Sequence, residues 1–178
     1  MAFVVTIGGS PSASSKSASL LALARARLAQ SSVETDAITV RDLPAQDLLH
    51  ARANAPGIAE AVALVQRAQG VVIATPIYKA AYSGILKAFL DLLPQDALAG
   101  KVVLPIATGG SLAHMLAIDY ALRPVLVALG AAQITGCVYL IDSQFSITDD
   151  GTQLDSLGTE RLDGALTAFV QQLPIAQL

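Results

Sequence analysis

The sequence predicts an α/β protein with a doubly wound, five-stranded parallel sheet in the order 2-1-3-4-5 and helices on both faces. Two observations lead to this fold class. Short β-branched apolar runs alternate with longer segments of helical periodicity, which is typical of βαβ units. The chain has 178 residues, 53% of them hydrophobic and 14% charged, which is enough for one well-buried domain spanning residues 1–178.

Five runs are predicted to be strands. Three of them, the first, third and fourth, are continuously apolar, as expected of parallel strands buried on both faces. In chain order the runs are Phe3–Ile7, Thr35–Val40, Val71–Ala74, Val102–Ala107 and Gln133–Ile141. The last run contains Cys137, the only cysteine. We expect it to be a small buried apolar side chain rather than a reactive thiol.

Five segments between and after these runs carry apolar residues at helical spacing. They are Ser17–Gln30, Ile58–Ala68, Ser83–Leu93, Leu112–Leu129 and Leu157–Leu173. In the first segment we expect Arg25 and Arg27 to be solvated. The longest connection, Arg41–Pro56, is predicted to be an irregular surface excursion.

Composition excludes several functions. The net charge of −3 leaves no basic face for nucleic acid. No apolar run approaches the ~18 residues of a membrane span. Two histidines and one cysteine, far apart, give no metal-ligand spacing. A single cysteine fits a reducing compartment, so we expect a cytoplasmic protein without nucleic-acid, membrane or metal partners.

Ligands of open parallel sheets bind beyond the carboxyl ends of the strands. The first such loop, Gly8–Ser17, reads GGSPSASSKS and runs into a helix start. It matches neither GxGxxG nor the P-loop. Helix-start N–H groups, serine hydroxyls and the charge of Lys16 together suit a phosphate monoester. The alternative is a serine-rich cap on a surface helix.

Two further strand ends suit a planar ring. After the third strand, Pro76 gives a rigid turn, and Ile77 and Tyr78 offer an apolar and aromatic wall. After the fourth strand, Gly109-Gly110 permits close backbone approach. The structural alternatives are a tyrosine that covers the core edge and a tight turn before a helix. Taken together, a phosphate loop and a flat slot suit flavin mononucleotide (FMN).

Four stretches also resemble a known family. They are GGSPSASSKSASLL (8–21), DLLHAR (47–52), ATPIYKAAYSGILKAFLDLLP (74–94) and KVVLPIATGGSLAHMLAIDYALRPVL (101–126). In these stretches the chain resembles the NAD(P)H-dependent FMN reductases, which have a flavodoxin-like fold. It is most similar to the flavin-reductase component of two-component alkanesulfonate monooxygenases.

The resemblance implies which residues bind FMN. Its phosphate would be held by Ser10, Ser15, Lys16 and Ser17. Its isoalloxazine would be lined by Pro76, Ile77, Tyr78, Lys79, Thr108, Gly109, Gly110 and Ser111. Relatives often carry arginine where this loop has Lys16, and lysine keeps the charge without the bidentate fork. Lys79 is expected to oppose negative charge on the reduced flavin.

The expected function is hydride transfer from NAD(P)H to FMN, after which the reduced flavin leaves for a partner monooxygenase. Such a transfer needs no protein acid or base, so we predict no catalytic side chain. Two alternatives stay open: a quinone or azo reductase that keeps FMN bound, and a flavodoxin-like electron carrier. The preference for NADH or NADPH also stays open.

The segment Leu112–Leu129 is apolar on all sides, whereas one sheet face covers only a stripe of a helix. We therefore expect it to form an interface with a second copy of the chain, and the resemblance implies a homodimer or homotetramer. The resemblance implies a π-bulge around Tyr120, and Pro124 independently predicts a disturbance there. Tyr120 would then lie at the interface.

Overall fold

The computed structural model describes residues 1–148 and 151–174. Its main sheet is mostly parallel and has the order β2-β1-β3-β5, with β6 and β7 both paired with β5 at the far edge and the short β4 antiparallel to β3. The predicted order 2-1-3-4-5 is thus confirmed. The strands are β1 (Phe3–Gly8), β2 (Glu34–Thr39), β3 (Gly70–Tyr78), β4 (Ala81–Tyr82), β5 (Val102–Gly109), β6 (Gln133–Ile134), β7 (Val138–Ile141), β8 (Phe145–Thr148) and β9 (Gly151–Leu154).

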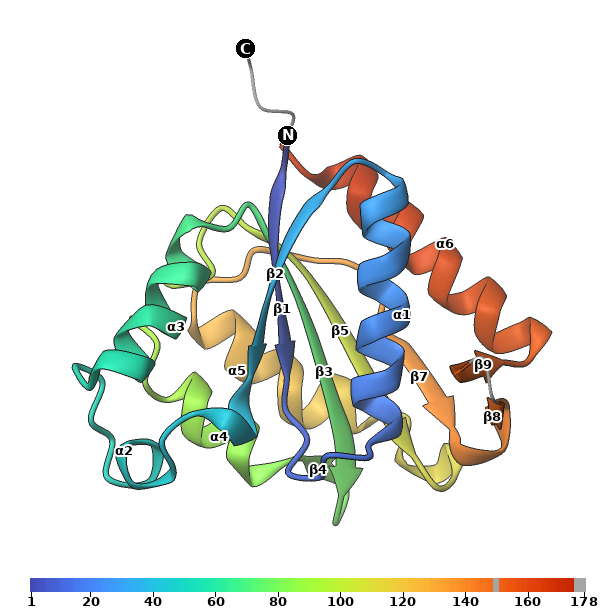
Figure 1. Ribbon diagram of the computed structural model, residues 1–178, viewed down its shortest axis with the longest axis horizontal. Helices are drawn as coiled ribbons and strands as arrows, with labels where there is room; N and C mark the ends of the chain where they lie inside the picture. The colour runs from blue at the N-terminus through green and yellow to red at the C-terminus, as the bar shows by residue number, and fades with distance from the viewer. Residues whose placement is uncertain (149–150, 175–178) are drawn as a thin grey trace.

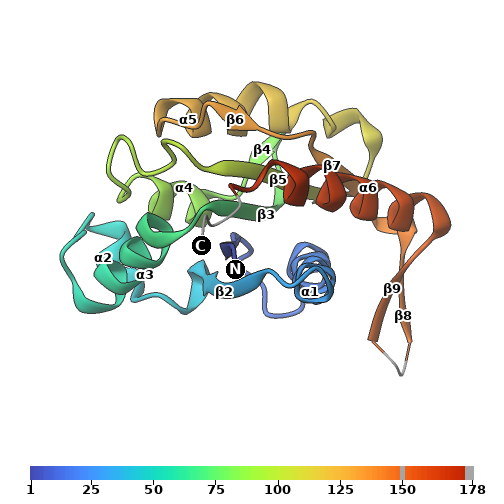
Figure 2. The same ribbon diagram turned by 90° about the horizontal axis from the view of Figure 1, so that it is seen from above.

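Helices cover both faces of the sheet, as predicted (Figures 1 and 2). They are α1 (Lys16–Gln30), α2 (Ala45–Leu49), α3 (Pro56–Arg67), α4 (Gly84–Leu90), α5 (Arg123–Ala128) and α6 (Ser156–Gln172). Neighbouring strand residues point to opposite faces. Val4 and Val72 therefore pack under α1 and α6, whereas Val5 and Val71 pack under α3, α4 and α5. Within the described ranges, no helix is both long and apolar enough to cross a membrane.

Two strands reach further than their sequences predict. We expected β3 to end at Ala74, but it continues to Tyr78, so residues 76–78 belong to a strand and not to a loop. The extension is paired, because Ile77 lies opposite Tyr82 and Tyr78 opposite Ala81 in an antiparallel hairpin. The partner strand β4 is too short to be recognised from sequence. Similarly, β5 continues past Ala107 to Gly109.

The fifth strand is not continuous, contrary to our expectation. The Val103 carbonyl accepts hydrogen bonds from the N–H and the hydroxyl of Thr135. Pro105 lies two residues further along β5, so its backbone nitrogen also faces the fifth strand, but proline has no N–H to donate. The ladder breaks there, and β7 resumes it one residue out of register. Cys137 lies in this break and is exposed, so the expectation of a buried cysteine was wrong.

The segment predicted as one helix, 112–129, has three parts. A 3-10 turn η2 (Leu112–His114) is capped by Ser111, whose hydroxyl accepts from the Ala113 N–H at 3.2 Å. A π-helix η3 (Ile118–Leu122) follows, and then α5. Pro124 explains the break, because it cannot donate to the carbonyl of Tyr120 four residues earlier. The π-bulge expected around Tyr120 is confirmed.

Residues 41–56 are also more regular than expected. They include part of the 3-10 turn η1 (Val40–Asp42) and the short helix α2, and Pro56 begins α3. A helix there escaped prediction because five residues carry too little periodicity. The C-terminal part adds a 3-10 turn, η4 (Asp142–Gln144), and the unpredicted hairpin β8–β9, which projects from the body (Figure 2).

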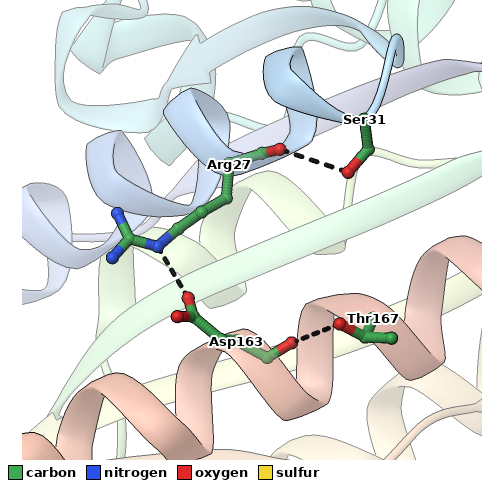
Figure 3. A network of polar contacts seen from close by, with 4 residues as sticks. All are labelled: Arg27, Ser31, Asp163 and Thr167. Atoms are coloured by element: carbon green, nitrogen blue, oxygen red, sulfur yellow. Dashed lines mark hydrogen bonds and ion pairs between the residues drawn. The ribbon is translucent and has the colours of Figure 1, made fainter.

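An ion pair joins α1 to α6 (Figure 3). The Arg27 Nε lies 2.7 Å from the Asp163 Oδ1. On the same network, Ser31 donates to the Arg27 carbonyl and Thr167 donates to the Asp163 carbonyl. Arg27 is therefore paired rather than simply solvated, because α6 lies next to α1 and brings a carboxylate that the local sequence does not reveal.

Candidate functional site

A cavity of about 320 Å³ lies where the carboxyl ends of the strands meet, at the lower edge of the sheet in Figure 1. It gathers the three segments that the sequence predicted to form one site. Its lining consists of Ser12, Ser14, Ser15, Lys16, Pro76, Ile77, Tyr78, Thr108, Gly109, Gly110 and Asp142. Eight of these were predicted site residues, whereas Ser12, Ser14 and Asp142 were not assigned from the sequence.

The loop after β1 is fixed to the sheet by its own backbone. The Gly9 N–H donates to the Ala74 carbonyl at 2.8 Å, and the buried Ser83 hydroxyl donates to the Gly9 carbonyl. A Cβ on Gly9 would lie only 2.8 Å from the Cβ of Leu86 in α4. Glycine is therefore required here for close approach to α4, and the loop starts from a rigid position.

Serine hydroxyls fill the rest of this loop. The Ser10 Oγ accepts from the Ser12 N–H at 3.1 Å, and the hydroxyls of Ser15 and Ser17 lie 2.8 Å apart. Ser10 and Ser17 are buried behind the cavity wall rather than in it. Because Ser15 turns its hydroxyl to Ser17, the first-turn N–H groups of α1 are left for a ligand at the helix start.

Lys16 brings positive charge to the cavity and Asp142 brings negative charge. The Lys16 Nζ lies 3.1 Å from the Asp142 Oδ1 and 3.3 Å from the Asp142 carbonyl oxygen. It also lies 5.9 Å from the ring centroid of Phe145. The sequence offered a signal for Asp142, because it directly follows β7, whose last residue pairs with Gly109 at the same sheet edge.

The opposite wall is apolar and aromatic. Ile77 is buried and Tyr78 is 49% exposed. Beyond them the hairpin turns through Lys79 and Ala80, which both have positive φ (50° and 63°). That conformation matches a two-residue β-turn and is unfavourable for residues with a side chain. The structure thus places Lys79 at the hairpin tip, outside the cavity lining.

The segment after β5 is held by Tyr139. Its hydroxyl donates to the Ser111 carbonyl at 2.7 Å, and a Cβ on Gly109 would collide with that hydroxyl. Burial raises the pKa of the Tyr139 phenol, and the nearby Asp142 carboxylate raises it further. Ser111 itself is exposed and caps η2, so the structure places it outside the cavity lining as well.

A small apolar cluster supports this wall from behind. Ile77, Ala107 and Tyr139 pack there against Ala117 and Ile118 at the start of the π-helix. The strand ends that line the cavity therefore rest directly on the segment that we expected to form an interface between subunits.

The chemistry of the lining fits an ester of phosphoric acid that carries a planar ring. Hydroxyls, helix-start N–H groups and a lysine suit the phosphate, and a flat apolar wall faces two glycines. In the described part of the chain, no three His, Cys, Asp or Glu side chains come together in a way that could hold a metal ion. The lining therefore offers groups that can bind a phosphate and orient a planar ring.

A doubly wound parallel sheet with such a cavity at its carboxyl edge defines a flavodoxin-like protein. A family model described as NADPH-dependent FMN reductase matches residues 3–146. The chain belongs to this family, which confirms the predicted class of enzyme: an oxidoreductase that uses FMN and NAD(P)H.

Individual relatives agree. An FMN reductase (NADPH) of Pseudomonas putida is 51% identical over 169 residues, which cover 93% of this chain and 85% of the relative. An FMN reductase (NADPH) of Escherichia coli is 48% identical over 170 residues, which cover 96% and 89%. The crystal structure of an NADH:FMN oxidoreductase (EMOB) in its apo form has a TM-score of 0.90, with 43% identity over 98% of this chain and 91% of that one.

Proposed function

We propose that this FMN reductase takes up FMN as a substrate, reduces it with NAD(P)H and releases it to a partner monooxygenase of the alkanesulfonate type. The cavity between the loop after β1 and the ends of β3 and β5 carries the proposal, because it is open and has two different walls. The phosphate-type wall consists of Ser12, Ser14, Ser15 and Lys16, and the ring-type wall consists of residues 76–78 and 108–110. The resemblance of four sequence stretches to such reductases supports the partner.

In this proposal the loop after β1 binds the FMN phosphate. Ser12, Ser14, Ser15 and Lys16 line the cavity beside the start of α1, whose first N–H groups and the Lys16 ammonium would bind the phosphate together with serine hydroxyls. Ser10 and Ser17 shape the loop from behind through their own hydrogen bonds. Each charge-assisted hydrogen bond to the phosphate is expected to contribute about 1.5–3 kcal/mol.

The isoalloxazine then lies against Ile77 and Tyr78, with the Gly109-Gly110 backbone at its edge. When bound, FMN supplies the hydride acceptor, and the chain's part is to orient the ring and to exclude water from one of its faces. From the hairpin tip, the Lys79 ammonium opposes the negative charge that reduction adds to the ring.

Steady-state oxidation of NADH and of NADPH, with FMN, FAD and riboflavin in turn, tests the proposed function. We expect saturation with free FMN and loss of FMN on a desalting column. If FMN stays bound through the column and free FMN shows no saturation, the protein is instead a reductase with a resident flavin. If neither nicotinamide is oxidised without a separate reductase, it is an electron carrier.

We also propose that residues 112–129 face a second copy of the chain in a homodimer or homotetramer. Large apolar side chains are exposed along this segment, and Tyr120 is 80% exposed. The others are Leu112, Met115, Leu116 and Val127. Apolar surface gathered in one place is typical of an interface. Tyr120 would lie in this interface, two residues after Ile118 of the apolar cluster that supports the cavity.

We further propose that residues 1–178 form a single flavodoxin-like FMN-binding domain and that the enzyme is cytoplasmic. The location is supported by the free thiol of Cys137, the only cysteine of the chain, which is compatible with a reducing compartment.

A further inference from the structure

Two acceptors of the same residue converge on the ammonium that the cavity offers to a phosphate. The carboxylate and the carbonyl of Asp142 both lie within 3.3 Å of the Lys16 Nζ. A lysine ammonium has three N–H donors. One of them donates to the Asp142 carbonyl, and the Asp142 carboxylate forms an ion pair with the same ammonium, so any other ligand in the cavity must share Lys16 with Asp142.

Asp142 is held in this position by the fold. The side chain of the buried Gln144 accepts from the Ile141 N–H at 3.2 Å and donates to the Asp155 carboxylate at 3.3 Å. The Asp155 carboxylate in turn accepts from the Gly158 N–H at 2.6 Å and so caps α6. The turn η4, which carries Asp142, is therefore held by Gln144 both to the end of β7 and to the start of α6.

A carboxylate so placed acts against a bound phosphate in two ways. It already pairs with the Lys16 ammonium, and its own charge repels a phosphate dianion that binds to the same ammonium. The ion pair itself is partly exposed, with 38% of the Lys16 side chain and 56% of the Asp142 side chain accessible, so a ligand can reach and displace it.

We infer that Asp142 is an affinity-setting residue, which lowers the affinity of the cavity for the phosphate of FMN by competing for Lys16. The inference rests on the proposed function, in which this cavity binds FMN through its phosphate. A reductase whose flavin must leave to react elsewhere needs a limited affinity, and a competing carboxylate limits it without altering the ring wall.

The substitution Asp142→Asn tests the inference, because it removes the charge and keeps the shape of the side chain. Dissociation constants of oxidised FMN and of riboflavin are measured by quenching of flavin fluorescence. We expect Asp142→Asn to bind FMN at least fivefold more tightly and riboflavin within twofold of the unaltered protein. Riboflavin lacks the phosphate, so it reports on the ring wall alone.

The second ion pair of α1 supplies a matched control. Asp163→Asn removes the same charge from the partner of Arg27. Arg27 lies eleven residues after Lys16 in α1, or about 16 Å along the helix. We expect its affinities for both flavins to stay unchanged. An equal gain in FMN affinity in Asp163→Asn would mean that overall charge, and not Asp142, is responsible.

The other possible results distinguish a wrong role for Asp142 from a wrong phosphate site. Weaker FMN binding by Asp142→Asn would show that Asp142 positions Lys16 for the phosphate, and unchanged binding would show no competition; either result overturns the inference. If Lys16→Ala lowers the affinities for FMN and riboflavin equally, the phosphate site itself is wrong. Asp142→Ser repeats the test should the asparagine variant fold poorly.

Discussion

The two walls of the cavity are built differently. The loop after β1 is tied to β3 and to the start of α4 by hydrogen bonds of Gly9 with Ala74 and Ser83. The ring-type wall, formed by the ends of β3 and β5, rests on an apolar cluster that includes Ile118 of the π-helix. Outside that cluster, the chain exposes Leu116 and Tyr120.

This difference separates what one chain provides by itself from what assembly with a second copy would provide. Hydrogen bonds within the chain fix the phosphate-type wall, so its selectivity should be intact in a monomer. The ring-type wall rests on a cluster beside an exposed apolar surface, so its rigidity should depend on what covers that surface. Changes to the two walls should therefore have separable effects.

The largest effect is expected from Leu116→Asp. It places a carboxylate on the exposed apolar surface where we propose that a second copy binds, and burying that charge without a partner is costly. We expect the dissociation constant of the oligomer to rise at least a hundredfold, or about 2.7 kcal/mol, in sedimentation experiments. Leu157→Asp, on α6 across the sheet, should leave assembly unchanged.

A monomeric unaltered protein at micromolar concentration would contradict the interface directly. If the Leu116→Asp monomer lost its preference for FMN over riboflavin, the phosphate-type wall would depend on assembly after all.

Gly9→Ala should break the phosphate-type wall. The added Cβ would lie 2.8 Å from the Leu86 Cβ, so the loop or α4 must shift. We expect a loss of about 1–3 kcal/mol in the free energy of unfolding and weaker FMN binding. For a chain of this length the melting temperature should fall by roughly 2–12 °C. Gly136→Ala, where a Cβ meets open space and which lies outside the cavity lining, is the control; equal losses in both variants would contradict the packing argument.

A smaller effect is expected from Tyr139→Phe in the ring-type wall. Loss of the hydrogen bond to the Ser111 carbonyl should cost about 0.5–1.5 kcal/mol of stability, whereas Tyr78→Phe, at a half-exposed tyrosine, should cost nothing measurable. Chemical denaturation of the three proteins measures both values.

The same variant has a pH signature. Because burial raises the pKa of the Tyr139 phenol above its usual 10.0, the folded protein holds this proton more tightly than the unfolded chain does. The stability that results is complete below about pH 10 and is lost as the pH rises through the raised pKa. The stability difference between the unaltered protein and Tyr139→Phe should therefore shrink above pH 10; a constant difference would contradict this.

Sequence reasoning succeeded where a signal is local or periodic. The buried strands, the helices with an apolar stripe and the meeting of three strand ends followed from such patterns, as did the break near Pro124. It failed where a distant partner decides. The strand β3 continues to Tyr78 because β4 pairs with it, and the fifth strand breaks opposite Pro105 on another strand. Asp142 directly follows the fifth strand, but its contact with Lys16 depends on a turn held by Gln144.

The central claim is that the loop after β1 and Lys16 bind the phosphate of the flavin. The most direct test is the ratio of the dissociation constants of riboflavin and FMN, measured side by side for the unaltered protein and for Lys16→Ala. We predict that the variant weakens FMN binding at least tenfold, which corresponds to about 1.4 kcal/mol, and leaves riboflavin binding unchanged, so that the ratio falls at least tenfold. A ratio that is the same in both proteins would contradict the account.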